Sequence, residues 1–300
     1  METIAPTNEE AAEAWGGVLF DRWLQFRDVV TVQISPFSEE ALRLHPPGPG
    51  ARVLDIGCGL GDTTTRIAEL VGDDGQVTGI DVGERFIEAA RAEAAEAGVA
   101  NVDYLLGDVQ VAELGGPYDY AFSRFGTMFF ASPVAALRNV RGALAPGGRL
   151  CMIVWRRKLD NEWLHRGERV VKEFLERPDE TDEPTCGPGP FSMADADTTT
   201  DILVHAGFEE IALNRHDIDY RMGDDLEKAI ELVTAMGPAG ELIRLATADA
   251  DEEAAAKARQ LRPKIETALR EAYSELATED GTRAQASAWI VSARAPAEAA

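Results

Sequence analysis

Short apolar runs alternate with longer amphipathic stretches through the first half of the chain. The runs predict strands at residues 52–56, 77–81, 102–106, 118–123 and 149–155. The stretches between them carry apolar residues at helical spacing and predict helices at residues 62–71, 84–97 and 133–144. This alternation is typical of a parallel sheet that helices cover on both faces, so we predict an α/β fold.

The second half of the chain continues this pattern. A helix is predicted at residues 195–205, and Gly207 is a suitable stop for it. Residues 208–213 and 288–293 are predicted to be the last two strands of the sheet.

Two long segments do not fit the sheet. Residues 157–194 begin with charged residues and end in a turn-rich loop without periodicity. Residues 221–285 are helical by pattern, and Pro263 is expected to begin or kink the second helix there. We place these segments as a cap over the carboxyl edge of the sheet, where open α/β folds bind ligands. We therefore predict one domain, 1–300, with a core at 36–156, 195–220 and 286–295 and cap or lid segments at 1–35, 157–194 and 221–285.

A glycine-rich turn joins the first predicted strand to the first predicted helix. Gly57 and Gly59 have no side chains, so the main chain there can approach a ligand closely, and both residues tolerate a positive φ. The third glycine is Gly61, which makes the pattern GxGxG, whereas the nicotinamide dinucleotide pattern is GxGxxG. That pattern would require glycine where Asp62 stands, and an anionic side chain at a helix start disfavours a pyrophosphate.

Three further motifs follow the glycine turn in order. Residues 76–81 form a strand with an acidic end, residues 105–109 place Asp108 after the third strand, and residues 144–150 read L-x-P-G-G-x-L. Together with the sequence from Asp55 to Gly61, these motifs resemble those of the class I S-adenosylmethionine-dependent methyltransferases. The resemblance extends over residues 50–156 and implies a Rossmann-like sheet of seven mostly parallel strands. It also implies S-adenosylmethionine as the cofactor and S-adenosylhomocysteine as the product.

The resemblance further implies which residues contact the cofactor. In the family, the glycine turn accommodates the amino-acid part of the cofactor, an acidic residue after the second strand binds the ribose hydroxyls, and an aspartate after the third strand meets the adenine amino group. The matching residues here are Asp55, Ile56, Gly57, Cys58, Gly59 and Gly61 for the turn, Asp81 and Val82 for ribose, and Asp108 and Val109 for adenine. The alternatives are a purely structural turn, a surface carboxylate at Asp81 and a helix cap at Asp108. At Cys58 a small filler is favoured over a nucleophile.

The segment after the fourth strand is expected at the methyl-donor end of the pocket. Arg124 would contact the cofactor or orient a substrate carboxylate, with a surface salt bridge as the alternative. Met128 and Phe129 are predicted to line the substrate cavity, with packing under the next helix as the alternative.

Methyl transfer from a sulfonium requires little chemistry from the protein, because the methyl group is already activated. Oxygen and nitrogen nucleophiles also need a proton removed. Of the four histidines, His165 is the candidate general base, because its segment leaves the fifth strand near the expected mouth of the site. An exposed histidine is the alternative. Trp163, two residues earlier, is expected to contact the substrate.

The amino-terminal segment is enriched in aromatic residues: Trp15, Phe20, Trp23 and Phe26 precede the core. Aromatic faces attract a sulfonium cation, so this segment is predicted to fold over the cofactor as a lid. A helix packed on the core is an equally good interpretation.

Composition narrows the class of partner. The net charge of −24 opposes binding to nucleic acid or to an anionic membrane, so a small-molecule substrate is expected. Cys58, Cys151 and Cys186 lack the paired spacing of a disulfide framework or zinc site, so no metal is predicted. Without an apolar leader or a run of about 20 apolar residues, the chain is expected in the cytoplasm. No oligomeric state is predicted.

These observations predict a methyltransferase that acts on a small molecule, with an oxygen, nitrogen or carbon acceptor equally open. A relative of the fold that binds S-adenosylmethionine without transferring its methyl group is the first alternative. A nicotinamide-dependent dehydrogenase is the second, and the spacing of the glycine turn disfavours it.

Overall fold

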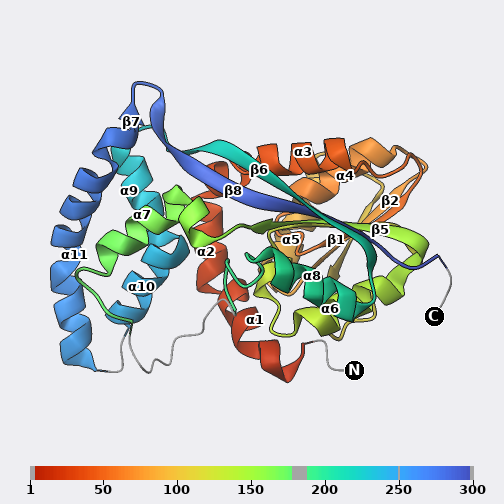
Figure 1. Cartoon of the computed structure of the whole chain (residues 1–300), viewed down its shortest axis with the longest axis horizontal. Helices are drawn as coiled ribbons and strands as arrows, with labels where there is room; N and C mark the ends of the chain where they lie inside the picture. The colour runs from red at the N-terminus through yellow and green to blue at the C-terminus, as the bar shows by residue number, and fades with distance from the viewer. Residues whose placement is uncertain (1–3, 178–187, 249–250, 298–300) are drawn as a thin grey trace.

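The computed structural model describes residues 4–177, 188–248 and 251–297 and contains one mixed sheet (Figure 1). Its strands lie in the order β3-β2-β1-β4-β5-β8-β6, and the short β7 pairs with β8. The strands are β1 (Arg52–Ile56), β2 (Gln76–Asp81), β3 (Val102–Leu106), β4 (Tyr118–Arg124), β5 (Leu144–Trp155), β6 (Glu209–Gly223), β7 (Ala277–Thr278) and β8 (Gly281–Arg294).

Strand direction confirms the predicted fold class. Strands β1 to β5 pair in parallel, and β8 is antiparallel to both of its long neighbours, β5 and β6. The last two long strands extend well beyond the predicted residues 208–213 and 288–293. Their extension forms a two-stranded ribbon in which Arg221 lies opposite Arg283. Small and polar residues dominate the start of β8, so no apolar run marks it in the sequence.

Helices cover the sheet on both faces (Figure 1). They are α3 (Ser35–Leu44), α4 (Asp62–Val71), α5 (Glu84–Glu96), α6 (Pro133–Ala143) and α8 (Ala196–Ala206). The ends of α8 follow local chemistry, since the Asp195 side chain accepts a hydrogen bond from the Thr198 amide and Gly207 takes a left-handed conformation after the last turn. All but α3 begin and end within one residue of the predicted bounds, and α3 was not predicted.

A second group of helices gathers at one end of the sheet, on the left of Figure 1. It consists of α7 (Glu162–Val171), α9 (Leu226–Ala235), α10 (Gly237–Thr247) and α11 (Glu252–Tyr273). Helix α11 runs through Pro263, so this residue does not begin the helix. Helices α1 (Glu9–Gly16) and α2 (Val18–Gln25) lie beside this group. Single turns occur at Pro6–Asn8, Asp28–Val32, Thr127–Phe129, Lys158–Asp160 and Ser274–Leu276.

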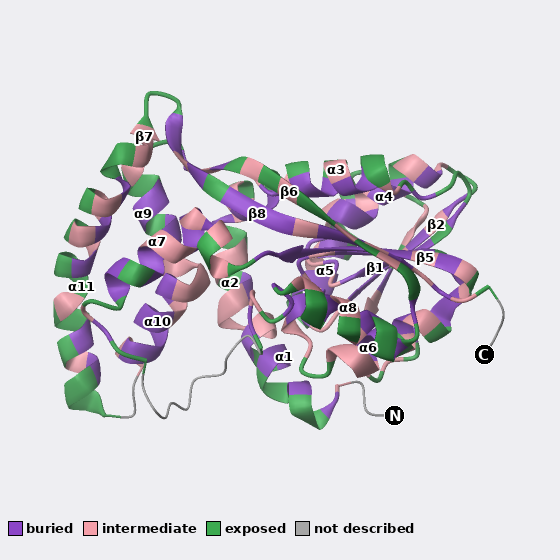
Figure 2. Ribbon diagram, viewed as in Figure 1, coloured by how far each residue is buried: buried purple, intermediate pink, exposed green. Residues whose placement is uncertain are grey.

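One continuous apolar cluster joins the sheet to these helices. It includes Ile56 and Phe122 in the sheet, Phe26 from the amino-terminal segment, and Leu242 and Leu269 from the helical group. Figure 2 shows buried residues along the strands and on the inward faces of the surrounding helices. The predicted division into a core and cap segments stays a prediction.

Helix packing at Gly167 in α7 provides a test of this arrangement. A Cβ atom at Gly167 would clash with Cγ1 of Val233 in α9, and a valine in a helix has little rotamer freedom. We expect Gly167→Ala to lower the free energy of unfolding by about 1–3 kcal/mol through overpacking. The matched control is Gly142→Ala in α6, where a Cβ would meet nothing within 4 Å. We expect this control to stabilise the protein by up to about 1 kcal/mol. Urea unfolding measures both, and equal stability of the Gly167 variant and the wild type would contradict the packing.

Candidate active site

The turn after β1 leaves room for a ligand. Gly57 has φ of 65° and Gly59 has φ of 55°, values that side-chain-bearing residues rarely adopt. A Cβ at Gly57 would lie 3.1 Å from the Cα of Gly126, so the two backbones pack against each other there. A Cβ at Gly59 would meet no atom within 4 Å, which leaves open space above the turn.

Asp55 anchors this turn from inside. Its side chain is fully buried and accepts hydrogen bonds of 2.7 Å from the hydroxyl groups of Thr63 and Thr64, in the first turn of α4. Burial raises the pKa of the Asp55 carboxyl, against the opposing effect of the two hydroxyl donors. Asp55, Ile56 and Gly61 are not among the residues that line the cavity described below. Their predicted contact with a cofactor stays a prediction.

Asp81 connects two strand ends. One carboxylate oxygen accepts from the Gly59 amide and the other from the Gly83 amide, both at 2.9 Å. Burial raises the pKa of the Asp81 carboxyl, and the backbone donors counteract part of this rise. Each carboxylate oxygen can accept more than one hydrogen bond, so Asp81 can still accept from a ligand hydroxyl. Asp81 and its neighbour Val82 both line the cavity.

Asp108 lies at the end of β3 and is almost fully buried. Its carboxylate accepts from the amide and the side chain of Gln110, each at 2.9 Å, and from the amide of Ala5 at 3.1 Å. The contact with Gln110 is a local turn, and no helix of the described chain begins there, which argues against the helix-cap alternative. Asp108 and Val109 line the cavity.

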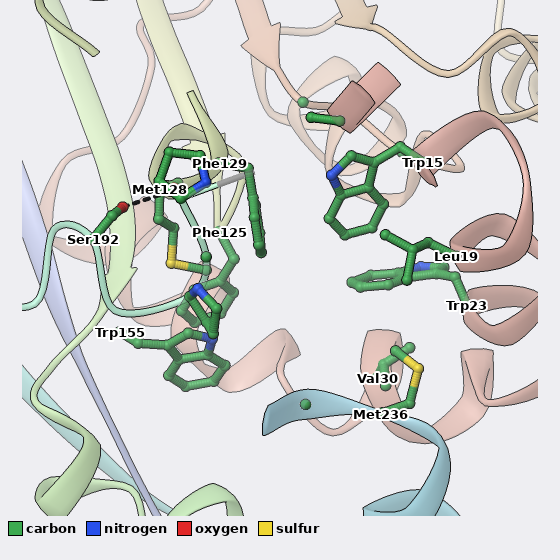
Figure 3. A pocket seen from close by; sticks show the side chains of 18 of the residues that line it. Trp15, Leu19, Trp23, Val30, Phe125, Met128, Phe129, Trp155, Ser192 and Met236 are labelled. Atoms are coloured by element: carbon green, nitrogen blue, oxygen red, sulfur yellow. Dashed lines mark hydrogen bonds between the residues drawn. The ribbon is translucent and has the colours of Figure 1, made fainter. Parts of the chain in front are cut away.

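One cavity of about 810 Å³ connects these groups to the helical end of the molecule. Its volume lies in the range of about 300–1,000 Å³ that is usual for ligand sites. In Figure 3, Trp15, Leu19 and Trp23 from the amino-terminal helices face Met128, Phe129 and Trp155 across it. Residues of α7 and α10 also line it, among them Leu164 and Leu242.

A family model described as a methyltransferase domain matches residues 47–183. Nocamycin O-methyltransferase of Saccharothrix syringae is 37% identical over 44% of this chain and 48% of its own length. Aklanonic acid methyltransferase DauC of Streptomyces sp. is 35% identical over 39% of this chain and 53% of its own length. Residues 47–183 form a class I S-adenosylmethionine-dependent methyltransferase domain. The matched part spans about half the length of these curated relatives.

Solved structures show that the fold of this chain is shared by proteins of low sequence identity. The YcgJ protein of Bacillus subtilis superimposes with a TM-score of 0.54 at 16% identity, covering 86% of this chain and 99% of the other. The [4+2]-cyclase SpnF superimposes with a TM-score of 0.51 at 21% identity, and the match covers 88% of this chain and 82% of SpnF. At these identities the likeness concerns the fold.

The family assignment confirms S-adenosylmethionine as the cofactor of the methyltransferase domain.

The segment after β4 forms one wall of the cavity. Arg124, Met128 and Phe129 line it, as does Trp163 of α7. Burial lowers the pKa of the Arg124 guanidinium, while the carboxylates of Asp62 and Asp55 favour its charged form. The surface salt bridge that was the alternative for Arg124 is not found among the described residues. These positions agree with the predicted contacts, and the contacts themselves stay predictions.

His165 is not among the residues that line the cavity. Leu164, Glu168 and Lys172 do line it, and their spacing of four residues places them on one side of α7. His165 is one residue further along, which turns its side chain by about 100° around the helix axis. The structure thus places Glu168, and not His165, in the cavity wall. The role of His165 as a general base stays a prediction without support from its position.

The amino-terminal segment both lines the cavity and packs on the core, so the two interpretations of it are compatible. The Trp15 ring lies 5.0 Å from the Phe129 ring, centroid to centroid, and Phe26 joins the main apolar cluster. Arg27 forms ion pairs with Asp62 at 3.1 Å and with Glu93 at 2.6 Å, which connect this segment to α4 and α5. These contacts hold the amino-terminal segment against α4, α5 and the segment after β4.

The cysteines and histidines of the described residues form no metal site. No group of three or more histidine, cysteine or acidic side chains is placed there to hold a metal ion. Cys58 and Cys151 are unpaired and buried, burial raises both thiol pKa values, and Cys186 lies outside the described residues.

No helix within 4–177, 188–248 or 251–297 has the length and apolar character needed to cross a membrane.

The predicted ribose contact at Asp81 is directly testable. We expect Asp81→Asn to weaken binding of S-adenosylhomocysteine by about 1–3 kcal/mol, because a charge-assisted acceptor is lost. In the wild type, affinity should fall with decreasing pH as Asp81 is protonated. This fall should begin above the ordinary aspartate pKa of 3.8, because burial raises the pKa of this carboxyl. Calorimetry between about pH 4 and 7 measures both effects.

The matched control is Asp74→Asn, an exposed carboxylate in the loop before β2. It should bind S-adenosylhomocysteine as the wild type does, and the pH dependence should be lost only in the Asp81 variant. Unchanged affinity of the Asp81→Asn variant would remove Asp81 from the cofactor site.

Proposed function

We propose that the whole chain transfers a methyl group from S-adenosylmethionine to a small, apolar acceptor held in the cavity. The observation that carries this proposal is the continuity of the cavity. It reaches from Gly59, Asp81 and Asp108 to an aromatic region formed by the amino-terminal segment and α7. A ligand in each part would lie in one enclosed space.

The protein's part in the proposed reaction is positioning. When bound, the sulfonium would supply an activated methyl group. The acceptor atom would bond to the methyl carbon while the carbon–sulfur bond breaks and its electron pair stays on sulfur, which gives S-adenosylhomocysteine. Asp81 and Asp108 would hold the ribose and adenine, and the open turn at Gly59 would admit the amino-acid part. The apolar walls exclude water, and holding two reactants in line supplies much of the rate enhancement.

The apolar walls of the cavity and the names of the curated relatives both support a small, apolar acceptor. Met128, Phe129 and Trp163 would contact an acceptor through apolar surface. The relatives from Saccharothrix syringae and Streptomyces are named for nocamycin and aklanonic acid, and both names denote small molecules. The acceptor atom is open between oxygen, nitrogen and carbon.

The two unpaired, buried cysteines favour action in the reducing cytoplasm.

A second candidate function is chemistry or binding at the same site without methyl transfer. SpnF, a structure of the same fold, is described as a [4+2]-cyclase, so the fold itself does not require methyl transfer. The absence of a histidine from the described cavity lining fits this candidate as well.

Turnover separates the two candidates. We expect the full chain to convert S-adenosylmethionine to S-adenosylhomocysteine only in the presence of an apolar aromatic acceptor, detected by mass spectrometry with a methyl-labelled cofactor. The Asp81→Asn variant should need a higher cofactor concentration for the same rate. Binding of S-adenosylhomocysteine without turnover across a broad panel of acceptors would favour the second candidate. Binding of NADH with no response to S-adenosylhomocysteine would overturn both.

A further inference from the structure

A compact charged cluster interrupts the apolar wall of the cavity. Glu168 of α7 lies between two ammonium groups: the Nζ of Lys158 is 2.7 Å from its carboxylate and the Nζ of Lys172 is 2.8 Å from it. All three residues line the cavity. The cluster has two positive charges and one negative charge, in a chain whose net charge is −24.

Glu168 holds the two lysines together. Its side chain is 10% exposed, whereas those of Lys158 and Lys172 are 37% and 60% exposed. Burial alone would raise the pKa of the Glu168 carboxyl, but the two ammonium groups bring it below its usual value, so the carboxylate is ionised at neutral pH. Each ammonium group has three donors and uses only part of them on Glu168, so both retain donors for another acceptor.

Aromatic rings line the same cavity as this cluster. Phe125 and Trp155 stack with centroids 3.9 Å apart and an interplanar angle of 18°. The centroid of the Trp163 ring lies 5.5 Å from that of Trp155, and the centroid of the Tyr220 ring lies 4.6 Å from that of Trp163. All four residues line the cavity. Phe125 has a φ of 60°, a strained conformation for a bulky residue that the surrounding packing maintains.

We infer that the acceptor is a flat aromatic carboxylate whose ring body lies along these aromatic side chains and whose carboxylate binds Lys158 and Lys172. This inference rests on the proposed function and specifies its substrate class. A carboxylate placed there completes an alternating arrangement of two cations and two anions. A hydrogen bond from an ammonium group to a carboxylate is charge-assisted, and such bonds are stronger than those between neutral groups. The carboxylate anchors the acceptor.

The other interpretation of this cluster is that Glu168 is the general base. Its lowered pKa makes it a weak base, since an effective base has a pKa near the working pH. The two interpretations differ in what Glu168→Gln does. If the lysines are the anchor, removing the negative charge should leave carboxylate binding unchanged or stronger and should keep methyl transfer. If Glu168 is the general base, the variant should lose methyl transfer without weaker carboxylate binding.

The test uses a pair of probes of the same size and ring system, one anionic and one neutral: anthraquinone-2-carboxylate and anthraquinone-2-carboxamide. Both are titrated into the full chain saturated with S-adenosylhomocysteine. We expect the carboxylate to bind about tenfold more tightly than the amide. The double variant K158Q/K172Q should lose this preference and keep most of its affinity for the amide. The matched control K228Q/K257Q removes two lysines from the outer helices α9 and α11 and should keep the preference.

Three outcomes would overturn the inference: equal binding of the two probes by the wild type, equal loss of preference in both double variants, or weaker carboxylate binding by Glu168→Gln. Binding of S-adenosylhomocysteine is measured first in every variant. Its absence in the wild type would reject the proposed function itself, whereas normal cofactor binding without probe preference would reject only the aromatic carboxylate.

Discussion

The two hydrogen bonds from backbone amides to Asp81 hold the site together. They join the glycine turn after β1 to the start of α5, so the ends of two neighbouring strands have one defined separation. A carboxylate suits this position because it accepts from both sides at once and still has capacity for a ligand. Buried polar groups need such partners, and one carboxylate oxygen of Asp55 finds them in the hydroxyl groups of Thr63 and Thr64. The open space above Gly59 exists because these two aspartates hold the turn in place.

The rest of the cavity is built by segments that add little to the sheet itself. The amino-terminal helices supply Trp15 and Trp23, and α7 supplies Trp163 and Glu168. The ion pairs of Arg27 attach the first group to α4 and α5, and the apolar cluster attaches the second. The part of the cavity at Gly59, Asp81 and Asp108 thus depends on the sheet, and the aromatic part depends on helices that surround it. A shared fold can in this way carry cavities with different walls.

Much of the fold was predictable because its signals are local. Each early strand is a short apolar run, and the glycine turn carries its own conformational requirement at Gly57 and Gly59. The start of β8 was missed because its stability comes from pairing with β6 over a long ribbon, a contact between segments about 60 to 70 residues apart in sequence. The charged cluster was missed for a similar reason. Lys158, Glu168 and Lys172 become neighbours in a cavity wall only when the orientation of α7 is known, and the same orientation removes His165 from that wall.

The ribbon of β6 and β8 also determines how the helical group is connected to the chain. Helices α9, α10 and α11 all lie between these two strands in sequence, and the strands are paired where the insertion leaves and returns, near Arg221 and Arg283. The entry and exit of the insertion are therefore adjacent. A different helical unit with the same spacing between its ends could replace the present one without shifting the register of the sheet. The paired strands thus separate the length and content of the helical insertion from the geometry of the sheet.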